Sequence, residues 1–278
     1  MRLAVLWLVA ASPSWCGQAP SRDQLLEALN HAAETFARTA PGLGARELLS
    51  QRGRRMSFIK GKSELRDQFV LADDFEKHEV DSAWHLTESG ALHEVREIRL
   101  IDAAPPDAGE VRHTLTLGGN APETKILLED LEHGRLEGAA TDFVPILLLF
   151  ETARQPNYEF GPPGRHKLGK TAAWVLHYRQ IAGDDTFTEF RDRSEVRRPA
   201  EGEIWFRQSD LLPVRVTMAI EEVLSVRYIL LNEARVDYTP SPFGLAPATV
   251  LHRQYLNRDL VTENRFRYTD LTGRPIQP

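Results

Sequence analysis

The sequence predicts an α+β fold: a large, curved antiparallel β-sheet, or half-barrel, that helices cover on its concave face. The first observation is an alternation of apolar and other residues within 202–238, carried by Val214, Val216, Met218 and Ile220, which indicates strands with one buried face. The second is that consecutive strands are joined by short connections, which favours antiparallel pairing because parallel crossovers need a dozen or more residues. The third is two apolar segments with helical spacing, 21–39 and 143–153, which would supply the cover.

Residues 1–16 match a secretory signal peptide, with one arginine, an uncharged stretch over 3–11 and a small-residue cleavage region. Ser14 and Cys16 stand at −3 and −1 of a cut before Gly17, and a buried strand or helix is the alternative interpretation. Cys16 is the only cysteine, and Trp15 before it disfavours a lipid anchor. No later apolar stretch is long enough to span a bilayer. We therefore expect a periplasmic or secreted protein without a transmembrane span after cleavage.

The remaining chain, 17–278, is expected to form a single domain that begins with helices. Ser21 can cap the first helix with Gln24 as its reciprocal partner, and the segment 46–53 is interpreted as a second, shorter helix.

A helical insertion is expected near 124–154. One helix is predicted over 124–136, and a second over 143–153 with Asp142 as its cap and Pro145 in its first turn. The second segment is apolar almost all round, so it should be buried on most sides.

Other segments with a period of two are predicted to be strands. They are 58–59, 68–71, 79–86, 92–100, 157–160, 172–181, 186–191, 251–256 and 260–268.

Composition and motifs argue against several function classes. The net charge of −6 disfavours a nucleic-acid-binding protein. The nine histidines are scattered, with no HExxH pair and no spacing typical of a metal site. No GxSxG motif occurs, and the acidic pairs at 73–74 and 184–185 are interpreted as turns. We therefore expect no enzyme activity, no cofactor and no metal.

Large apolar side chains suggest where a hydrophobic ligand would bind. They could form an ordinary core, or they could line an apolar cavity between the sheet and the helices. The candidate cavity residues are Trp84, Phe143, Leu147, Phe150, Trp174, Tyr178, Trp205, Met218 and Tyr228.

A short motif resembles a known family. Gly202, Ile204 and Trp205 lead through a turn to Pro213 and Arg215, as in the periplasmic lipoprotein-localisation-factor family, which includes the outer-membrane lipoprotein carrier and a sensor of mislocalised envelope components. The segment 263–271 is also similar to uncharacterised secreted bacterial proteins. The resemblance implies a half-barrel with a helical lid, an Arg215 that helps to hold the lid closed, and a lipoprotein acyl chain as partner.

Two hypotheses of function follow. In the first, the chain is an exported, non-enzymatic envelope protein that binds a lipid, a lipoprotein acyl chain or another hydrophobic small molecule. In the second, it is an interaction module with a solid core and no ligand, whose partner is another envelope protein. A hydrolase with an unrecognised site is a third and weaker interpretation, because no titratable residues are grouped in the sequence.

Overall fold

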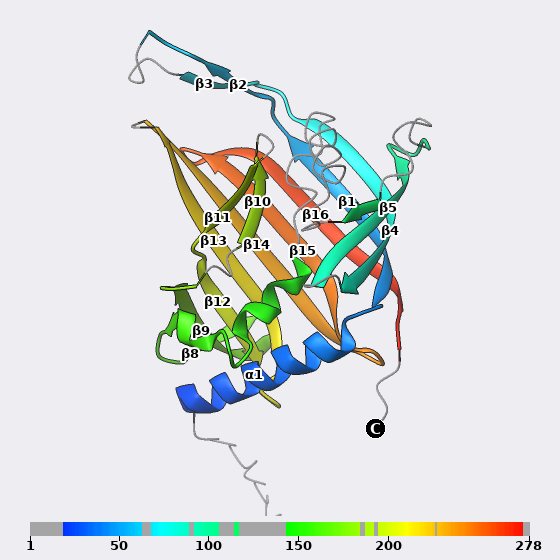
Figure 1. The fold of residues 1–278 in the computed structure, drawn as a ribbon, viewed down its shortest axis with the longest axis vertical. Coiled ribbons are helices and arrows are strands. Elements are labelled where there is room, and N and C mark those ends of the chain that lie inside the picture. Colours follow the sequence, from blue (N-terminus) through cyan, green and yellow to red (C-terminus); the bar gives the residue numbers. More distant parts are fainter. Residues whose placement is uncertain are drawn as a thin grey trace, which may run out of the picture.

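A computed structural model describes residues 19–62, 68–88, 92–105, 114–116, 143–183, 187–191, 194–225 and 227–274. The helical elements are α1 (Arg22–Thr39), η2 (Val144–Phe150) and η3 (Gln155–Asn157). The first strands are β1 (Gly44–Gly53), β2 (Met56–Ile59), β3 (Gln68–Leu71), β4 (Glu76–Glu88), β5 (Leu92–Ile101), β6 (Thr114–Thr116), β7 (Tyr158–Phe160), β8 (Gly164–Leu168) and β9 (Thr171–Gln180). The remaining strands are β10 (Phe187–Arg191), β11 (Ser194–Arg198), β12 (Glu201–Arg207), β13 (Pro213–Ser225), β14 (Tyr228–Ser241), β15 (Gly244–Leu256) and β16 (Asp259–Thr272) (Figure 1).

One large antiparallel sheet dominates the described part of the chain, so the predicted α+β class is confirmed. Twelve strands form it, in the order β6-β5-β4-β1-β16-β15-β14-β13-β12-β9-β7, with β8 paired to β9. The strands β12 to β16 are neighbours in both sequence and space, as short connections require. Separate two-stranded sheets are formed by β2–β3 and by β10–β11.

The prediction of a second helix over 46–53 is wrong, because this segment is β1, between β4 and β16. Its inward side chains include Glu47 and Gln51, which are 1% and 3% exposed. Since two of the buried positions carry polar residues, the segment has little of the apolar alternation that marks a strand in the sequence.

The first predicted helix is confirmed as α1. The Ser21 hydroxyl accepts from the Gln24 amide, and the Gln24 side chain accepts from the Ser21 amide, which completes the predicted capping box. The buried stripe of α1 is Leu25, Leu29, Ala32, Ala33 and Phe36.

The second predicted helix, 143–153, is replaced by the shorter 3₁₀ helix η2, which ends at Phe150. Its predicted burial is confirmed, with Val144, Leu147 and Phe150 fully buried. Pro145, in the first turn, has no amide hydrogen to donate, and 3₁₀ segments are usually this short. The predicted helix over 124–136 and the cap Asp142 lie outside the described residues.

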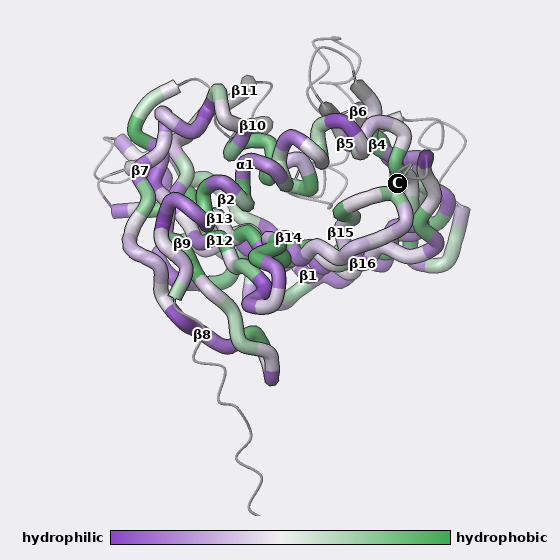
Figure 2. Tube along the Cα trace, turned by 90° about the horizontal axis from the view of Figure 1, so that it is seen from below, coloured by the Kyte–Doolittle hydropathy of each residue, from purple (hydrophilic) through white to green (hydrophobic). Residues whose placement is uncertain are grey.

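The core lies between the sheet and the two helices. α1 contacts η2, β13 and β15, and η2 also contacts β5. Figure 2 shows α1 between the two ends of the bent sheet, with β7 on one side and β5 on the other. Among the described helices, none combines the length and the apolar character needed to cross a membrane.

Candidate functional site

Seven of the nine predicted cavity residues meet in one hydrophobic cluster. At most 8% of any of them is exposed, and they belong to the core that η2 and α1 form with the sheet. These residues are Trp84, Phe143, Leu147, Phe150, Trp174, Tyr178 and Met218.

Trp205 lies on the other face of the sheet, and its assignment to the cavity is wrong. Its neighbours Ile204 and Phe206 are fully buried, whereas Trp205 is half-buried. The indole packs against His166, with ring centroids 5.6 Å apart, and beneath the guanidinium of Arg215. Because adjacent strand residues point to opposite faces, only one face of the apolar run 204–206 could belong to the core.

Tyr228 is also outside the cluster. It stands at the start of β14 and packs edge-on against Phe69 of β3, which in turn contacts Phe58 of β2. It therefore belongs to the junction with the β2–β3 hairpin.

The sequence motif around Gly202 has a packing role. A Cβ at Gly202 would lie 2.1 Å from the backbone oxygen of Thr217 on β13, so only glycine fits there. Pro213 begins β13 and pairs with Phe206.

The expectation that Arg215 holds a lid closed is not met in this structure. Its Nε lies 2.5 Å from Asp237 on β14, on the outer face and away from α1 and η2. The ion pair joins two neighbouring strands, so its role here is within the sheet.

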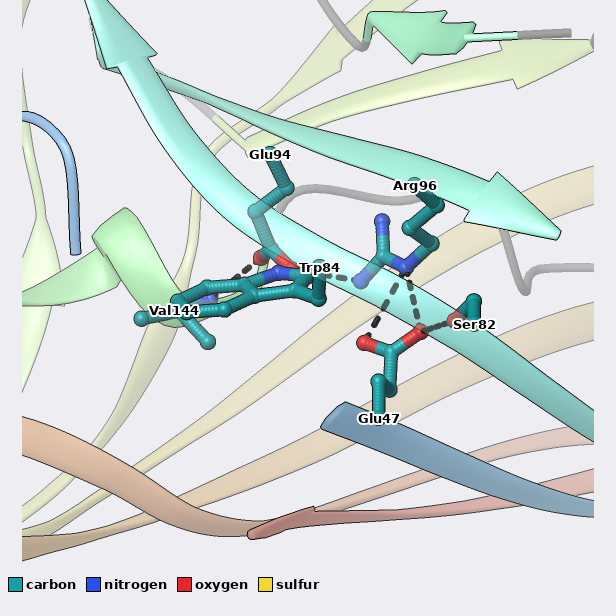
Figure 3. Close-up of polar contacts among 6 residues, drawn as sticks. All are labelled: Glu47, Ser82, Trp84, Glu94, Arg96 and Val144. Atoms are coloured by element: carbon teal, nitrogen blue, oxygen red, sulfur yellow. Dashed lines mark hydrogen bonds and ion pairs between the residues drawn. The ribbon is translucent and has the colours of Figure 1, made fainter. Parts of the chain in front are cut away.

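A buried polar network, drawn in Figure 3, connects the sheet to η2 instead. Glu94 of β5 accepts from the Trp84 indole at 2.7 Å, from Arg96 Nη2 at 2.5 Å and from the Val144 amide at 2.7 Å. The Nε of Arg96 donates to both oxygens of Glu47, at 2.8 and 3.1 Å. Glu94 thus anchors the first residue of η2 to β5.

Charge balance in this network favours the ionised arginine. Burial opposes the charge on Arg96, but the two carboxylates, Glu47 and Glu94, raise its pKa well above the ordinary value. Sequence reasoning missed all three residues. The sequence signal that could have indicated this network is the presence of charged residues at alternate positions of a predicted strand, as at Glu94 and Arg96.

The backbone of Val144 is held from a second side. The Tyr238 hydroxyl of β14 donates to the Val144 carbonyl at 2.7 Å. Since β5 and β14 are five positions apart in the sheet, the start of η2 bridges two separate regions of one face.

A polar row continues along the same face. Gln51 donates to Asn264 at 2.6 Å, and the Asn264 amide lies 3.2 Å from His252 Nδ1. The His252 ring packs on Phe143, 4.9 Å between centroids. Burial lowers the pKa of His252 to about 3, so the ring is neutral near pH 7.

A cleft of about 880 Å³ lies at the start of α1. Its apolar lining includes Leu26, Tyr158, Phe160 and Tyr178. Phe150 lies behind this lining, 4.8 Å from Tyr178 between ring centroids. The cleft therefore reaches the predicted cavity residues through Tyr178, which contacts Phe150.

Charged side chains surround this cleft. Arg22 of α1, the Arg179–Glu159 ion pair and the carboxylates of Glu201 and Glu203 line it. An apolar lining with charged groups around it suits an amphipathic molecule, because apolar and charged parts would each find a matching environment.

A second, smaller cavity of about 310 Å³ lies on the other half of α1. It is lined mainly by apolar groups, among them Ala32, Phe36, Leu212 and Leu245. Groups of three or more His, Cys, Asp or Glu residues that could hold a metal ion are absent from the described residues.

Comparisons with known proteins give one structural likeness. No protein-family model and no curated protein sequence matches the chain. The chain is similar to a crystal structure from Vibrio parahaemolyticus that is described as an outer membrane lipoprotein-sorting protein domain. The match covers 91% of this chain and 93% of that one, with 10% identity and a TM-score of 0.37. The strand order of the large sheet describes the fold independently of this likeness.

Proposed function

We propose that this protein is an exported, non-enzymatic envelope protein that binds a hydrophobic ligand, such as a lipid or the acyl chain of a lipoprotein. The observation that carries the proposal is the cleft beside α1, whose volume of about 880 Å³ lies in the range of small-molecule sites. Its aromatic lining is continuous with the core beneath the helices.

In this proposal, α1 and η2 form the cover of the concave face. The apolar part of the ligand lies against Leu26 and Phe160, and its polar end stays near Arg22. The hydrogen bonds from Val144 to Glu94 and from Tyr238 to Val144 hold the start of η2 in place while the ligand occupies the cleft.

Export is proposed from the pattern of residues 1–16, an arginine followed by an uncharged apolar stretch. The expected location is the periplasm or the outside of the cell. Recovery of the protein in the periplasmic fraction, shortened at its N-terminus, would support it; a full-length protein in the cytoplasm would contradict it.

The test of ligand binding is a titration of the purified protein with a fluorescent fatty acid. We expect saturable binding that Leu26→Gln weakens by about tenfold or more, since burying a leucine side chain contributes roughly 1.5–3 kcal/mol. Leu48→Gln is the matched control, because Leu48 is half-buried on the outer face of β1. Equal binding by both variants would refute the placement of the ligand in the cleft.

A second function is favoured by a separate observation: the predicted cavity residues are packed and nearly inaccessible. A filled core suits an interaction module without a ligand, whose partner is another envelope protein. Native mass spectrometry separates the two functions. A co-purifying lipid supports the first, and a bare chain that also binds no fatty-acid probe supports the second.

A further inference from the structure

The outer face of the sheet carries a concentration of arginines that the proposed ligand site does not use. We call it the arginine face, and it comprises Arg52, Arg215, Arg235, Arg253, Arg265 and Arg267. They come from five neighbouring strands, β1, β16, β15, β14 and β13.

The strand register brings these residues together on three adjacent rungs. On the first rung, Arg52 pairs with Glu263, which pairs with Arg253. On the second rung, Leu251 stands between Arg265 and Arg235.

On the third rung, Thr249 stands between Arg267 and Asp237, and Asp237 pairs with Arg215. With strands about 4.8 Å apart and alternate residues about 7 Å apart, the face extends roughly 19 by 14 Å.

The arginines outnumber the carboxylates that neutralise them. Glu263 holds three of them, with Arg52 at 3.0 Å, Arg253 at 2.7 Å and Arg265 at 2.9 Å. Asp237 holds Arg215 and Arg235, at 2.5 and 3.4 Å.

Within the five strands, Glu233, opposite Arg253, is the third carboxylate. The flanking strands continue these rungs with Lys77, Glu79 and Asp81 on β4 and with Glu201 on β12. On the five strands that carry the arginines, six arginines against three carboxylates leave a charge of +3, whereas the whole chain has a net charge of −6.

The excess of positive charge affects Arg235. Burial, together with the charges of Arg215, Arg253 and Arg265, lowers its pKa despite the opposing effect of Asp237. An added anion would relieve this repulsion. Arg267 is exposed and forms no ion pair within the described residues, so its five donors remain available for an outside acceptor.

The chemistry of the face selects its partner. A guanidinium binds a phosphate through two parallel hydrogen bonds, and neighbouring strands present several guanidinium groups side by side on the outer face. Large exposed apolar side chains of the described chain, such as Phe58, Ile181 and Val223, lie outside these rungs. On the five strands, the large apolar side chains of these rungs are the half-buried Leu48 and Leu251. The face is therefore far less apolar than the centre of a typical protein interface.

We propose that the arginine face docks the protein on a bilayer that contains anionic phospholipids, through their phosphate groups. The face is on the side of the sheet opposite α1 and η2. A docked molecule would thus keep its helices directed away from the bilayer.

The test is co-sedimentation of the purified protein with vesicles of equal parts phosphatidylglycerol and phosphatidylcholine. Surface attraction contributes about 1 kcal/mol per basic residue, so the double variant Arg265→Gln/Arg267→Gln should partition roughly thirtyfold more weakly. Binding should also fall as salt is added, because salt screens charges on a surface. Vesicles of phosphatidylcholine alone should bind weakly.

The matched control removes two exposed positive charges elsewhere, with Arg38→Gln/Lys62→Gln. It lowers the net charge equally but should leave partitioning unchanged. The single variant Arg267→Gln guards against misfolding, since it breaks no described ion pair and should weaken partitioning about fivefold.

Three results would overturn the proposal. The first is equal partitioning of the wild type, the arginine variants and the control. The second is release by inorganic phosphate that exceeds release by chloride at the same ionic strength, which would indicate a site for free phosphate. The third is binding of duplex DNA as tight as that of the vesicles, which would indicate a general polyanion site.

Discussion

The anchoring of η2 by Glu94 leads to the sharpest prediction about stability. Glu94 is fully buried, and its described hydrogen bonds include those accepted from Trp84, Arg96 and Val144. Glu94→Ala removes every acceptor and leaves two neutral donors and part of a charged one without partners. A buried unsatisfied donor costs about 1–3 kcal/mol, and loss of one member of a buried ion pair typically costs about 3–5 kcal/mol. We expect a loss of about 3–5 kcal/mol.

Glu94→Gln separates shape from charge at the same position. The amide oxygen of the glutamine can still accept one or two of these hydrogen bonds. Its amide nitrogen is a donor, however, and would face a donor that the carboxylate now accepts from. Arg96 keeps its two bonds to Glu47. We therefore expect a smaller loss, about 1–3 kcal/mol.

Urea unfolding measures both losses, with Glu97→Gln on the same strand as the exposed control, expected to change stability by less than about 0.5 kcal/mol. Hydrogen exchange adds a local measurement, because the Val144 amide should exchange faster in both Glu94 variants. A Glu94→Ala protein within about 1 kcal/mol of wild type, with an unchanged Val144 amide, would refute the idea that this carboxylate anchors η2.

Three further predictions concern single side chains. Burial lowers the pKa of His252 from 6.5 to about 3 in the folded protein. The resulting contribution to the free energy of unfolding is complete above pH 6.5 and falls by about 1.4 kcal/mol per pH unit as the pH drops towards 3. In urea unfolding at a series of pH values, His252→Gln should remove this slope. Gly202→Ala would bring a Cβ against the Thr217 carbonyl, so we expect a loss of roughly 1–3 kcal/mol in thermal or urea unfolding. Tyr238→Phe removes the hydrogen bond to the Val144 carbonyl and should cost about 1 kcal/mol in the same assay.

Each of these has a contrary outcome. An identical pH slope in the His252 variant would show that other groups cause the acid sensitivity. Gly53→Ala has 3.5 Å of clearance at its Cβ, so a Gly202→Ala protein no less stable than Gly53→Ala would contradict the steric argument. Wild-type stability in Tyr238→Phe would mean that this bond contributes nothing measurable.

Elements with local signals can be predicted from the amino-acid sequence alone. The capping box of Ser21 and Gln24 and the apolar stripe of α1 are complete within one segment. The alternation in 214–220 and the short connections set the antiparallel order of β12 to β16. Both depend on residues a few positions apart, so no knowledge of the rest of the chain was needed.

Which side chains meet depends on contacts between segments that are distant in the sequence. Glu47, Glu94 and Arg96 come from β1 and β5, which are separated by β4. Because these residues are charged, the sequence pattern does not identify the faces that carry them as buried. A period of two assigns Trp205 and Phe206 to opposite faces, but neighbouring strands and helices determine which face is buried. The anchor on η2 and the arginine face both arise from register between distant segments, which no local pattern contains.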